Sequence, residues 1–416
     1  MPPIRRVLAL SHFNVGINRV FEDYCNGISA NASEYHFIDY VDAYRKFGHC
    51  GFEDYIERFA AKHGITHVVF VWWSCDLTFD PTFLARLASK ARLVMNFFDT
   101  EYFFEGVDRY LAQSADLVML PDELSRHRYE HLGIPAHTSF ALFDRHAYRR
   151  DPEIRPDIDV AFVGNIKQAD RAEYIHFLKS NGIRVEAFGH GTDNGFVDFD
   201  DMVRLFNRAR INLNFTGTSN FDNYAITLPR INQRIRQSKG RPIEIALSGG
   251  FILSQYAVGI EAMFEPGREF DVFRTKEELL SKVRHYLDHE DERSAMALRA
   301  HERAIANYDT ERGFAKIFAK LDSLPRQTPT SLYLDKEFRR NYVAFRFFYL
   351  ALFLLEGKFA RAVEELSVGA RTGRIAWSAA YHFFIRGVLH FLREHPRLEA
   401  IAKGARSRLP WIRIKY

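Results

Sequence analysis

The chain has 416 residues, a length that favours two or three domains over a single small one. Hydrophobic residues make up 47% and charged residues 26% of it, which is typical of a globular protein and excludes a largely disordered chain. The formal net charge of +4 is too small to indicate a nucleic-acid partner, and we expect none. It suits phosphorylated small molecules or an anionic membrane surface equally well.

The first 150 residues alternate short apolar runs with helical segments. The runs are rich in valine and read IRRVLALS, THVVFVWW, RLVMNFF and ADLVML. Continuous apolar runs of this length are typical of strands that are buried on both faces of a parallel sheet. Between them, residues 52–64 have helical spacing and end in a glycine. Residues 1–150 are therefore predicted to form a doubly wound, Rossmann-like domain.

A charged segment with two prolines, residues 144–159, interrupts this pattern and predicts a linker. The alternation then restarts with the strand candidates IDVAFVGN, IRVEAFG, INLNF and FILSQ. Residues 157–322 are therefore predicted to form a second Rossmann-like domain. After a second linker at 323–331, residues 332–416 carry almost only helix signals and predict an all-α C-terminal extension.

The sequence favours a cytoplasmic protein. Its three cysteines form no CxxC pair, so a disulfide framework or a cysteine zinc site is not expected. No segment reaches the ~18 apolar residues of a membrane-spanning helix, since YVAFRFFYLALFLLEG is too short and contains Arg346. The aromatic and basic extension, which ends in LPWIRIKY, predicts packing on the core together with peripheral contact at the inner face of the membrane.

One segment of the second domain, SKGRPIEIALSGGFILSQY at residues 238–256, combines cations with a carboxylate. Pro242 suits the first turn of a helix, which places Lys239 and Arg241 near the helix N-terminus, where a phosphate or diphosphate is stabilised. Glu244 follows within the first turn and suits the vicinal diol of a ribose, because a carboxylate accepts hydrogen bonds from both hydroxyls. The pattern indicates a nucleotide-sugar site beyond the carboxyl ends of the strands, in a cleft between the two domains.

A purely structural interpretation of this segment stays open. The helix dipole alone favours a glutamate in the first turn, and KGR suits a solvated loop. Gly249 and Gly250 are a common way to end a helix. We include both glycines among the nucleotide-binding candidates.

The same segment resembles the C-terminal domain of the glycosyltransferases related to spore maturation protein, in the GT-B superfamily. FEPGREFDVFRTKEELLSKVRHYLDHEDER, DVAFVGNIKQADR and RARINLNF fit the resemblance in the expected order, over about residues 157–315. The first half fits as a generic GT-B domain, with NFFDTEYFFEG in the place of an acidic and aromatic segment. The helical extension is not covered.

This resemblance implies a nucleotide-diphosphate sugar as donor substrate, held by the second domain, and an acceptor held by the first. It implies no cofactor and no metal. In the related retaining enzymes two glutamates are separated by seven residues, and the second contacts the ribose. Glu244 matches the second glutamate, but Arg236 occupies the position of the first. That departure weakens any transfer of retaining stereochemistry and leaves a cation near the expected donor phosphates.

A second group of donor candidates follows the first strand of this domain, in FVGNIKQADR. Gly164 and Asn165 come directly after the strand, and a glycine there lets the backbone approach a phosphate. Lys167 and Arg171 follow toward the next helix. An ordinary strand-to-helix turn with a solvated basic helix start is the alternative.

Three residues that follow strands of the first domain are candidate catalytic groups. His12 is a candidate general base because an imidazole group titrates in the useful range, although a lone histidine after a strand is more often structural. Asp99 and Glu101 are expected to face the cleft, where they bind acceptor hydroxyls or take a proton from one. Helix capping is the alternative for Asp99.

The motif DxD at Asp198 and Asp200 holds a divalent metal in GT-A glycosyltransferases. Here Asp200 or Asp201 is expected to cap the following helix, and no metal site is predicted. No His/Cys cluster has metal-ligand spacing either.

The sequence thus predicts a metal-independent GT-B glycosyltransferase that acts on a glycan, a lipid-linked sugar or a protein. A non-catalytic GT-B-like scaffold with a partner-binding helical tail is the main alternative. A metal-dependent GT-A enzyme is the second.

Overall fold

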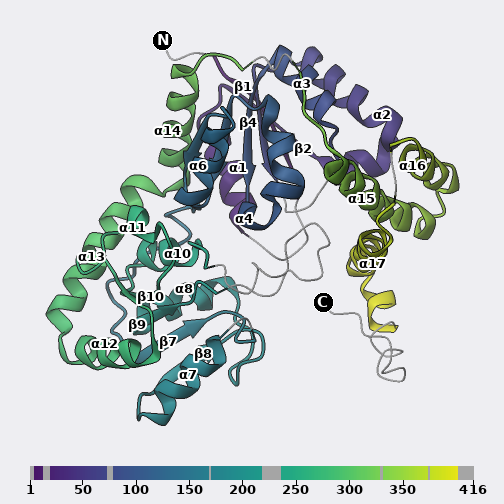
Figure 1. Ribbon diagram of the computed structural model, residues 1–416. Helices are drawn as coiled ribbons and strands as arrows, with labels where there is room; N and C mark the ends of the chain where they lie inside the picture. The colour runs from purple at the N-terminus through teal and green to yellow at the C-terminus, as the bar shows by residue number, and fades with distance from the viewer. Residues whose placement is uncertain are drawn as a thin grey trace.

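Two parallel β-sheets, each with helices packed against it, form the two lobes of the molecule (Figure 1). The computed structural model describes residues 4–12, 19–72, 78–167, 170–217, 236–327, 331–372 and 375–401. The first sheet has the order β2 (Glu34–Asp39), β1 (Arg6–Ser11), β3 (His67–Trp72), β4 (Arg92–Phe97), β5 (Leu117–Leu120) and β6 (Ala136–Thr138). The second has the order β11 (Asp271–Phe273), β10 (Ile252–Gln255), β9 (Ala209–Asn214), β7 (Ile158–Val163) and β8 (Val185–Phe188).

Every neighbouring pair in both sheets is parallel. Alternate side chains of β1 enter different cores, because Leu8 and Leu10 point to one face of the sheet and Val7 and Ala9 to the other. Burial on both faces explains the continuous apolar runs of the sequence. The predicted α/β fold class, with two Rossmann-like domains and a helical C-terminal region, is confirmed.

Helices connect the strands within each sheet. In the first half they are α1 (Val20–Ala30), α2 (Tyr40–Lys62), α3 (Pro81–Lys90), α4 (Thr100–Phe103), a π-helical turn (Phe104–Asp108), α5 (Arg109–Leu111), a 3₁₀ turn (Ala112–Ser114) and α6 (Glu123–His131). In the second they are α7 (Arg171–Ser180), α8 (Phe199–Arg208), α10 (Arg241–Leu247) and α11 (Ile260–Met263). The last strand of this sheet is followed by α12 (Lys276–Asp288), α13 (Glu290–Asn307) and α14 (Thr310–Ser323). Asp198 caps α8 by accepting a hydrogen bond from the backbone N–H of Asp201 at 2.8 Å. The expectation that Asp200 or Asp201 forms this cap is therefore wrong.

The chain crosses between the two lobes twice. Phe140 and Phe143, which lie before the predicted linker, already pack in the core of the second sheet. At the other end, α14 returns to the first sheet, where Phe314 and Ile317 pack in the same cluster as Val7. The predicted second domain at 157–322 therefore includes a helix whose apolar face belongs to the first sheet.

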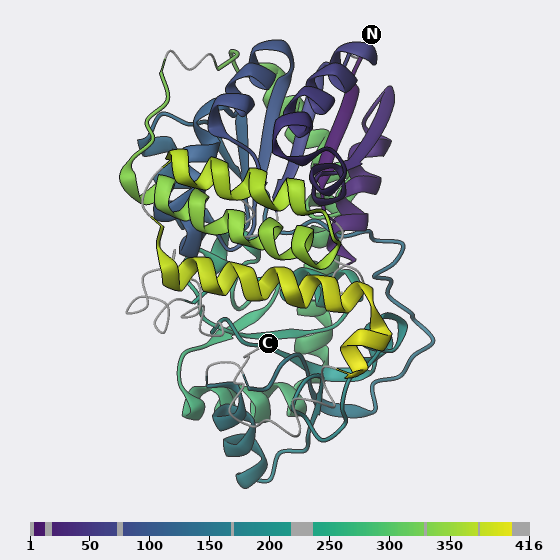
Figure 2. The ribbon, with the colours of Figure 1, turned by 90° about the vertical axis from the view of Figure 1, so that its right-hand side faces the viewer.

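The extension forms a layer over the first domain. It consists of α15 (Lys336–Leu355), α16 (Phe359–Thr372) and α17 (Trp377–Glu394), with α15 in contact with both of its neighbours (Figure 2). Tyr349 of α15 stacks on Tyr44 of α2 with ring centroids 4.0 Å apart, so the layer shares the core of the first domain. Arg346, the charged residue within the apolar segment that became α15, is buried and pairs with Glu365 of α16 at 3.2 Å. Within the described part of the chain, no helix is both long enough and apolar enough to span a bilayer.

Close packing of α15 against α17 depends on Gly387. A Cβ atom at this position would lie 2.4 Å from the carbonyl oxygen of Phe348, whereas one at Gly369 of α16 would meet Val343 at an ordinary 3.5 Å. We therefore expect Gly387→Ala to lower the free energy of unfolding by ~1–3 kcal/mol through overpacking. Gly369→Ala is the matched control and should be neutral or slightly stabilising, because alanine favours a helix interior. Chemical denaturation measures both, and equal effects of the two substitutions would contradict the packing argument.

Candidate functional site

A cleft of about 590 Å³ lies between the two domains. Its walls are the ends of strands and the loops that follow them in both sheets, which is where ligands bind in folds of this class. Most of the predicted site residues line it: Asp99, Glu101, Gly164, Asn165, Arg171, Lys239, Arg241 and Glu244. The structure therefore brings together predicted residues from segments that are far apart in the chain.

Three cations line the second-domain side of the cleft. Arg171, at the start of α7, is 6% exposed and donates hydrogen bonds to the carbonyl oxygens of Asn165 and Gly217, both at 3.0 Å. Its Nε finds no hydrogen-bond partner within the described ranges. Burial, followed by the charge of Arg241, lowers the pKa of Arg171 to about 10. Burial and the charge of Arg171 likewise lower the pKa of Lys239 to about 8. These cations repel one another, so an anion in the cleft would relieve the repulsion.

Glu244 is held in the cleft by two neighbours. The hydroxyl of Tyr148 donates to its Oε1 at 2.9 Å, and Arg241 pairs with its Oε2 at 2.7 Å. Arg241 is itself positioned by the ring of Phe206, whose centroid lies 5.4 Å from the guanidinium carbon. The two contacts thus hold the Glu244 side chain at a fixed place beside the cations.

Acidic groups form the opposing side of the cleft. The side-chain amide of Gln237 donates to Asp99 Oδ1 and to Glu101 Oε2, each at 3.0 Å. Burial raises the pKa of Asp99, and burial together with the charges of Asp122 and Asp99 raises the pKa of Glu101 to about 8. A carboxyl group with this pKa is well suited to exchange a proton at neutral pH.

Asp99 adopts a left-handed backbone conformation with φ of 53°. This conformation is unfavourable for residues other than glycine, and such residues concentrate at functional sites. The Asp99 side chain makes no capping hydrogen bond to α4. The Asp99 side chain is therefore held by its hydrogen bond with Gln237. Helix capping, the alternative interpretation from the sequence, does not account for its position.

Arg236 is turned away from the expected phosphate position. Its guanidinium makes two contacts with the Asp170 carboxylate, at 2.8 and 3.2 Å, and donates to Gln255 Oε1 at 2.8 Å. It is not among the described residues that line the cleft. The additional cation that the sequence led us to expect at the donor phosphates is thus paired with Asp170 in this structure.

Two of the predicted residues lie outside the cleft because other parts of the chain hold them. His12 Nδ1 lies 3.0 Å from Asp39 Oδ2, and the ring of His390 from α17 lies over it at 5.3 Å. Lys167 is exposed, and its backbone N–H bonds the side chain of Asn165 at 2.9 Å in a local turn. Neither residue lines the cleft.

Gly249 and Gly250 also lie outside the cleft, at the far end of α10. The N–H of Gly249 bonds the carbonyl of Ala246 at 2.9 Å, and that of Gly250 bonds the carbonyl of Ile245 at 3.0 Å. This pair of bonds is the Schellman motif, and Gly249 supplies its left-handed φ of 79°. The structural interpretation of the two glycines is therefore the one that the geometry supports.

Tyr148 and Gln237 are among the residues of the cleft that sequence reasoning missed, and both hydrogen-bond a predicted site residue. Tyr148 lies in the segment that was interpreted as a linker, and only its aromatic character within a charged stretch sets it apart. Gln237 directly precedes the KGR segment, and no local pattern predicts its reach toward the first domain.

The structure brings no metal-ligand group together in the cleft, as far as the described residues go. Asp198 is occupied by its capping bond to α8. The one group of metal-ligating side chains found among the described residues is Glu34, His36 and His63, at the other end of the first sheet.

Comparison with known families agrees with this geometry. Residues 167–319 match the family model "Glycosyl transferase-like". The matched segment contains Arg171, Lys239, Arg241 and Glu244. The predicted resemblance to glycosyltransferases is thereby confirmed, whereas the closer relation to spore maturation protein stays a prediction. No curated protein matches the sequence.

Several solved structures share the fold. HepE from Anabaena in complex with UDP and glucose has a TM-score of 0.53 at 13% identity, over 77% of this chain and 100% of that one. Sucrose-phosphate synthase from Thermosynechococcus elongatus has a TM-score of 0.51 at 9% identity, over 77% and 100%. A glycosyltransferase from Rickettsia africae has a TM-score of 0.52 at 9% identity, over 77% and 98%. At these identities the likeness shows a common fold, and the GT-B arrangement of the two domains is confirmed.

The raised pKa of Glu101 predicts how stability depends on pH. In the unfolded chain this carboxyl ionises near its ordinary pKa of 4.5, whereas in the folded chain it keeps its proton up to about pH 8. The folded state therefore binds more protons between these values, and the contribution of Glu101 to stability is lost as pH rises through 8. We expect Glu101→Gln to be more stable than the parent protein at pH 8.5, by ~1–3 kcal/mol, and the two to converge below pH 4.5.

The measurement is urea denaturation across this pH range. Glu302→Gln, at an exposed position of α13, serves as the control and should leave the pH profile unchanged. A Glu101→Gln variant that follows the parent profile at every pH would show that Glu101 is ionised in the folded protein.

Proposed function

We propose that this chain is a glycosyltransferase that moves a sugar from a nucleoside-diphosphate donor to a glycan, a lipid-linked sugar or a protein. One observation carries the proposal: Arg171, Lys239 and Arg241 converge on one side of an interdomain cleft, beside the carboxylate of Glu244. The glycosyltransferase family match, which includes all four residues, supports it.

The cations are the donor-binding part of the site. Arg171 has an unpartnered buried Nε within the described ranges, and Lys239 is destabilised as a cation by its surroundings. A diphosphate placed between them supplies the missing negative charge. The same charges stabilise the diphosphate as it leaves the sugar, so they lower the barrier as well as binding the donor. No metal ion or cofactor is needed for this role.

Glu244 binds the ribose of the donor. Its two oxygens are oriented by Tyr148 and Arg241, and they remain able to accept hydrogen bonds from the two ribose hydroxyls. UDP is the nucleotide to test first, because HepE, which shares the fold, has been solved with UDP.

Asp99 and Glu101 receive the acceptor on the other side of the cleft. One of the two carboxyl groups, both of which share the amide of Gln237, takes the proton of the attacking hydroxyl. Their raised pKa values make a carboxylate in this place a stronger base than an exposed one. The proton thus moves to the first domain while the leaving diphosphate stays with the second.

Removal of the Lys239 charge tests the donor site. We expect Lys239→Ala to weaken UDP binding by roughly 10- to 100-fold, since a hydrogen bond to a charged group contributes ~1.5–3 kcal/mol, and to leave uridine binding nearly unchanged. In the parent protein, UDP affinity should fall as pH rises through about 8, because Lys239 loses its proton there. Calorimetric titration with UDP and uridine at several pH values measures both effects.

Two further variants sharpen this experiment. Lys167→Ala removes an exposed lysine outside the cleft and should leave both affinities unchanged. Glu244→Gln should weaken UDP and uridine binding by a similar factor, because both ligands carry the ribose. The donor-site assignment fails if Lys239→Ala weakens uridine and UDP binding equally. If UDP binds but UDP-sugars are neither transferred nor hydrolysed, the chain is the non-catalytic scaffold that the sequence left open.

The helical extension provides contact with the cytoplasmic face of a membrane, where lipid-linked acceptors reside. Phe359, Val363 and Leu366 form an exposed apolar stripe along α16, with 66%, 65% and 49% of each side chain accessible. Their spacing of four and three residues places them on one face of the helix. Trp377 and Tyr381 form a similar pair on α17. Exposed apolar side chains gathered in this way mark an interaction surface.

This surface predicts binding to anionic lipid vesicles. We expect the double variant Phe359→Ser, Val363→Ser to bind such vesicles at least tenfold more weakly than the parent protein, with unchanged UDP affinity. Added salt should weaken the remaining binding, because charge attraction to the headgroups is screened. Phe196→Ser, which removes a phenylalanine of the second domain that is 88% exposed, is the control for a general effect of apolar surface. Equal vesicle binding by all three proteins would exclude a role of α16.

A further inference from the structure

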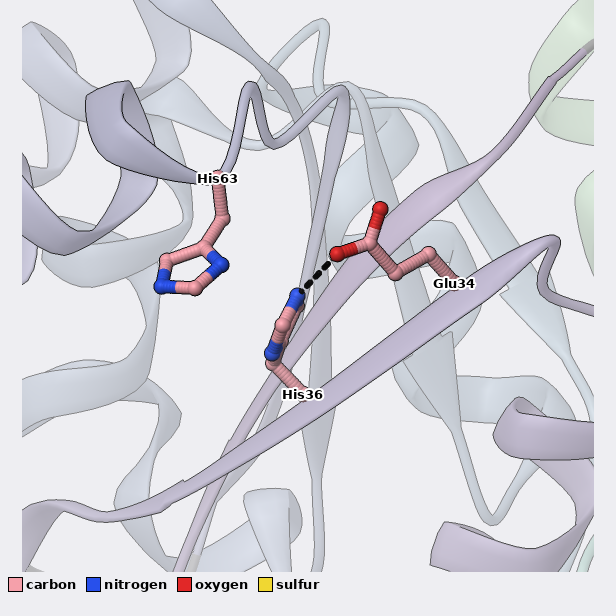
Figure 3. Close-up of side chains that lie close together, drawn as sticks. All are labelled: Glu34, His36 and His63. Atoms are coloured by element: carbon pink, nitrogen blue, oxygen red, sulfur yellow. Dashed lines mark hydrogen bonds and ion pairs between the residues drawn. The ribbon is translucent and has the colours of Figure 1, made fainter.

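A group of potential metal ligands lies at the outer edge of the first sheet, outside the proposed donor cleft. Glu34 and His36 stand on β2, the edge strand, and His63 directly follows α2 (Figure 3). The donor cleft lies beyond the carboxyl ends of the strands, whereas Glu34 begins β2 at the opposite end. A function of this group is therefore independent of the transferase proposal.

The three side chains converge on one point. One ligand atom from each residue lies within 4.8 Å of the ligand atoms of the other two. His36 Nε2 is 2.8 Å from Glu34 Oε1, and the rings of His36 and His63 have centroids 4.4 Å apart. Figure 3 shows a nitrogen of His63 turned toward the gap between His36 and Glu34. Ligands of a tetrahedral zinc ion are separated by about 3.4 Å, so small rotations of these partly exposed side chains would complete the site.

The ring of Phe59 in α2 packs against both imidazoles. Its ring stacks on His63 with centroids 4.3 Å apart and meets His36 edge-on at 5.3 Å. Glu34 and His36 are two residues apart on a strand, so their side chains leave the same face. The hydrogen bond between Glu34 and His36 accounts for the contact of that pair, but it gives no reason for His63 to face it as well.

We infer that Glu34, His36 and His63 bind a divalent transition-metal ion, with Zn²⁺ as the best match. Two imidazoles and one carboxylate are a ligand set that Zn²⁺ accepts, and three protein ligands leave one position for water. The ion joins the edge strand to the end of α2, since His36 and His63 lie on these two separate elements. It also covers an edge strand that pairs with only one neighbour, β1.

Zinc titration of the chelator-treated full chain tests this inference. We expect one equivalent of Zn²⁺ to bind in competition with a chromophoric chelator, and the melting temperature to rise with the logarithm of zinc concentration. His63→Ala and Glu34→Gln should each weaken zinc affinity more than tenfold and remove the thermal shift. Co²⁺ in place of Zn²⁺ should show the visible absorption bands of a four- or five-coordinate ion in the parent protein only.

A second surface pair of histidines provides the matched control. His285 stacks on His289 at 4.0 Å and lies 2.8 Å from Glu292, but His289 Nδ1 is engaged by the His285 carbonyl oxygen. His289→Ala should therefore leave zinc binding unchanged. The inference is overturned if the parent protein binds no zinc more tightly than His63→Ala, or if His289→Ala weakens binding as much as His63→Ala does. All the substituted side chains are at least partly exposed, so the variants are expected to fold.

Discussion

The mutual placement of the two domains depends on the close contact between α1 and α14. A Cβ atom on Gly27 would lie 2.0 Å from Thr310 Oγ1 and 2.7 Å from the Phe314 ring, so only glycine admits this contact. Thr310 completes it by donating a hydrogen bond to the carbonyl of Asp23 at 2.7 Å. Because α14 continues directly from α13 of the second domain, this contact anchors that domain to the first sheet. This contact therefore sets how far apart the two walls of the cleft lie.

One wall of the cleft carries the cations and the other the buried carboxyl groups of Asp99 and Glu101, and a neutral side chain joins them. Gln237 belongs to the second domain, but its amide reaches the carboxyl groups of Asp99 and Glu101 in the first. Lys239, two residues further on, faces the same acids from the cation-rich side. The cation-rich and the acidic parts of the cleft are thereby linked by only a few residues of one loop. A small relative movement of the domains would alter both halves of the site together.

Most of the strands that were predicted from the sequence lie inside a sheet, where both faces of the strand are buried and its residues are apolar along the whole length. The runs that became β1, β3, β4, β5 and β7 are buried on both faces, and each was located to within a few residues. Three of the four strands at the sheet edges were missed: β2 reads EYHFID, and β6 and β11 have three residues each. The fourth, β8, was predicted from the run IRVEAFG. Edge strands lose much of the apolar signal because one side of each remains open.

The site was predictable where its chemistry is local and unpredictable where it depends on distant contacts. Lys239 and Glu244 share one short segment, so their association was visible in the sequence. The burial of His12 was not, because the ring that lies beside it, His390, comes from α17, more than 370 residues further along the chain. The grouping of Glu34, His36 and His63 could not be predicted for the same reason, because the spacing rules for metal ligands apply to residues that are close in the sequence.

The shared core of the first domain also bears on how the chain matures during synthesis. Residues of β1 and α2 pack against side chains of α14, α15 and α17, of which Phe383 is among the last to leave the ribosome. The N-terminal sheet therefore lacks much of its apolar cover while the second domain is being made. At ~5–20 residues per second this interval lasts on the order of tens of seconds, long enough for exposed apolar surface to need protection by chaperones. The second domain, whose cores use residues 140–308, can close earlier, so the half made first is the last to be completed.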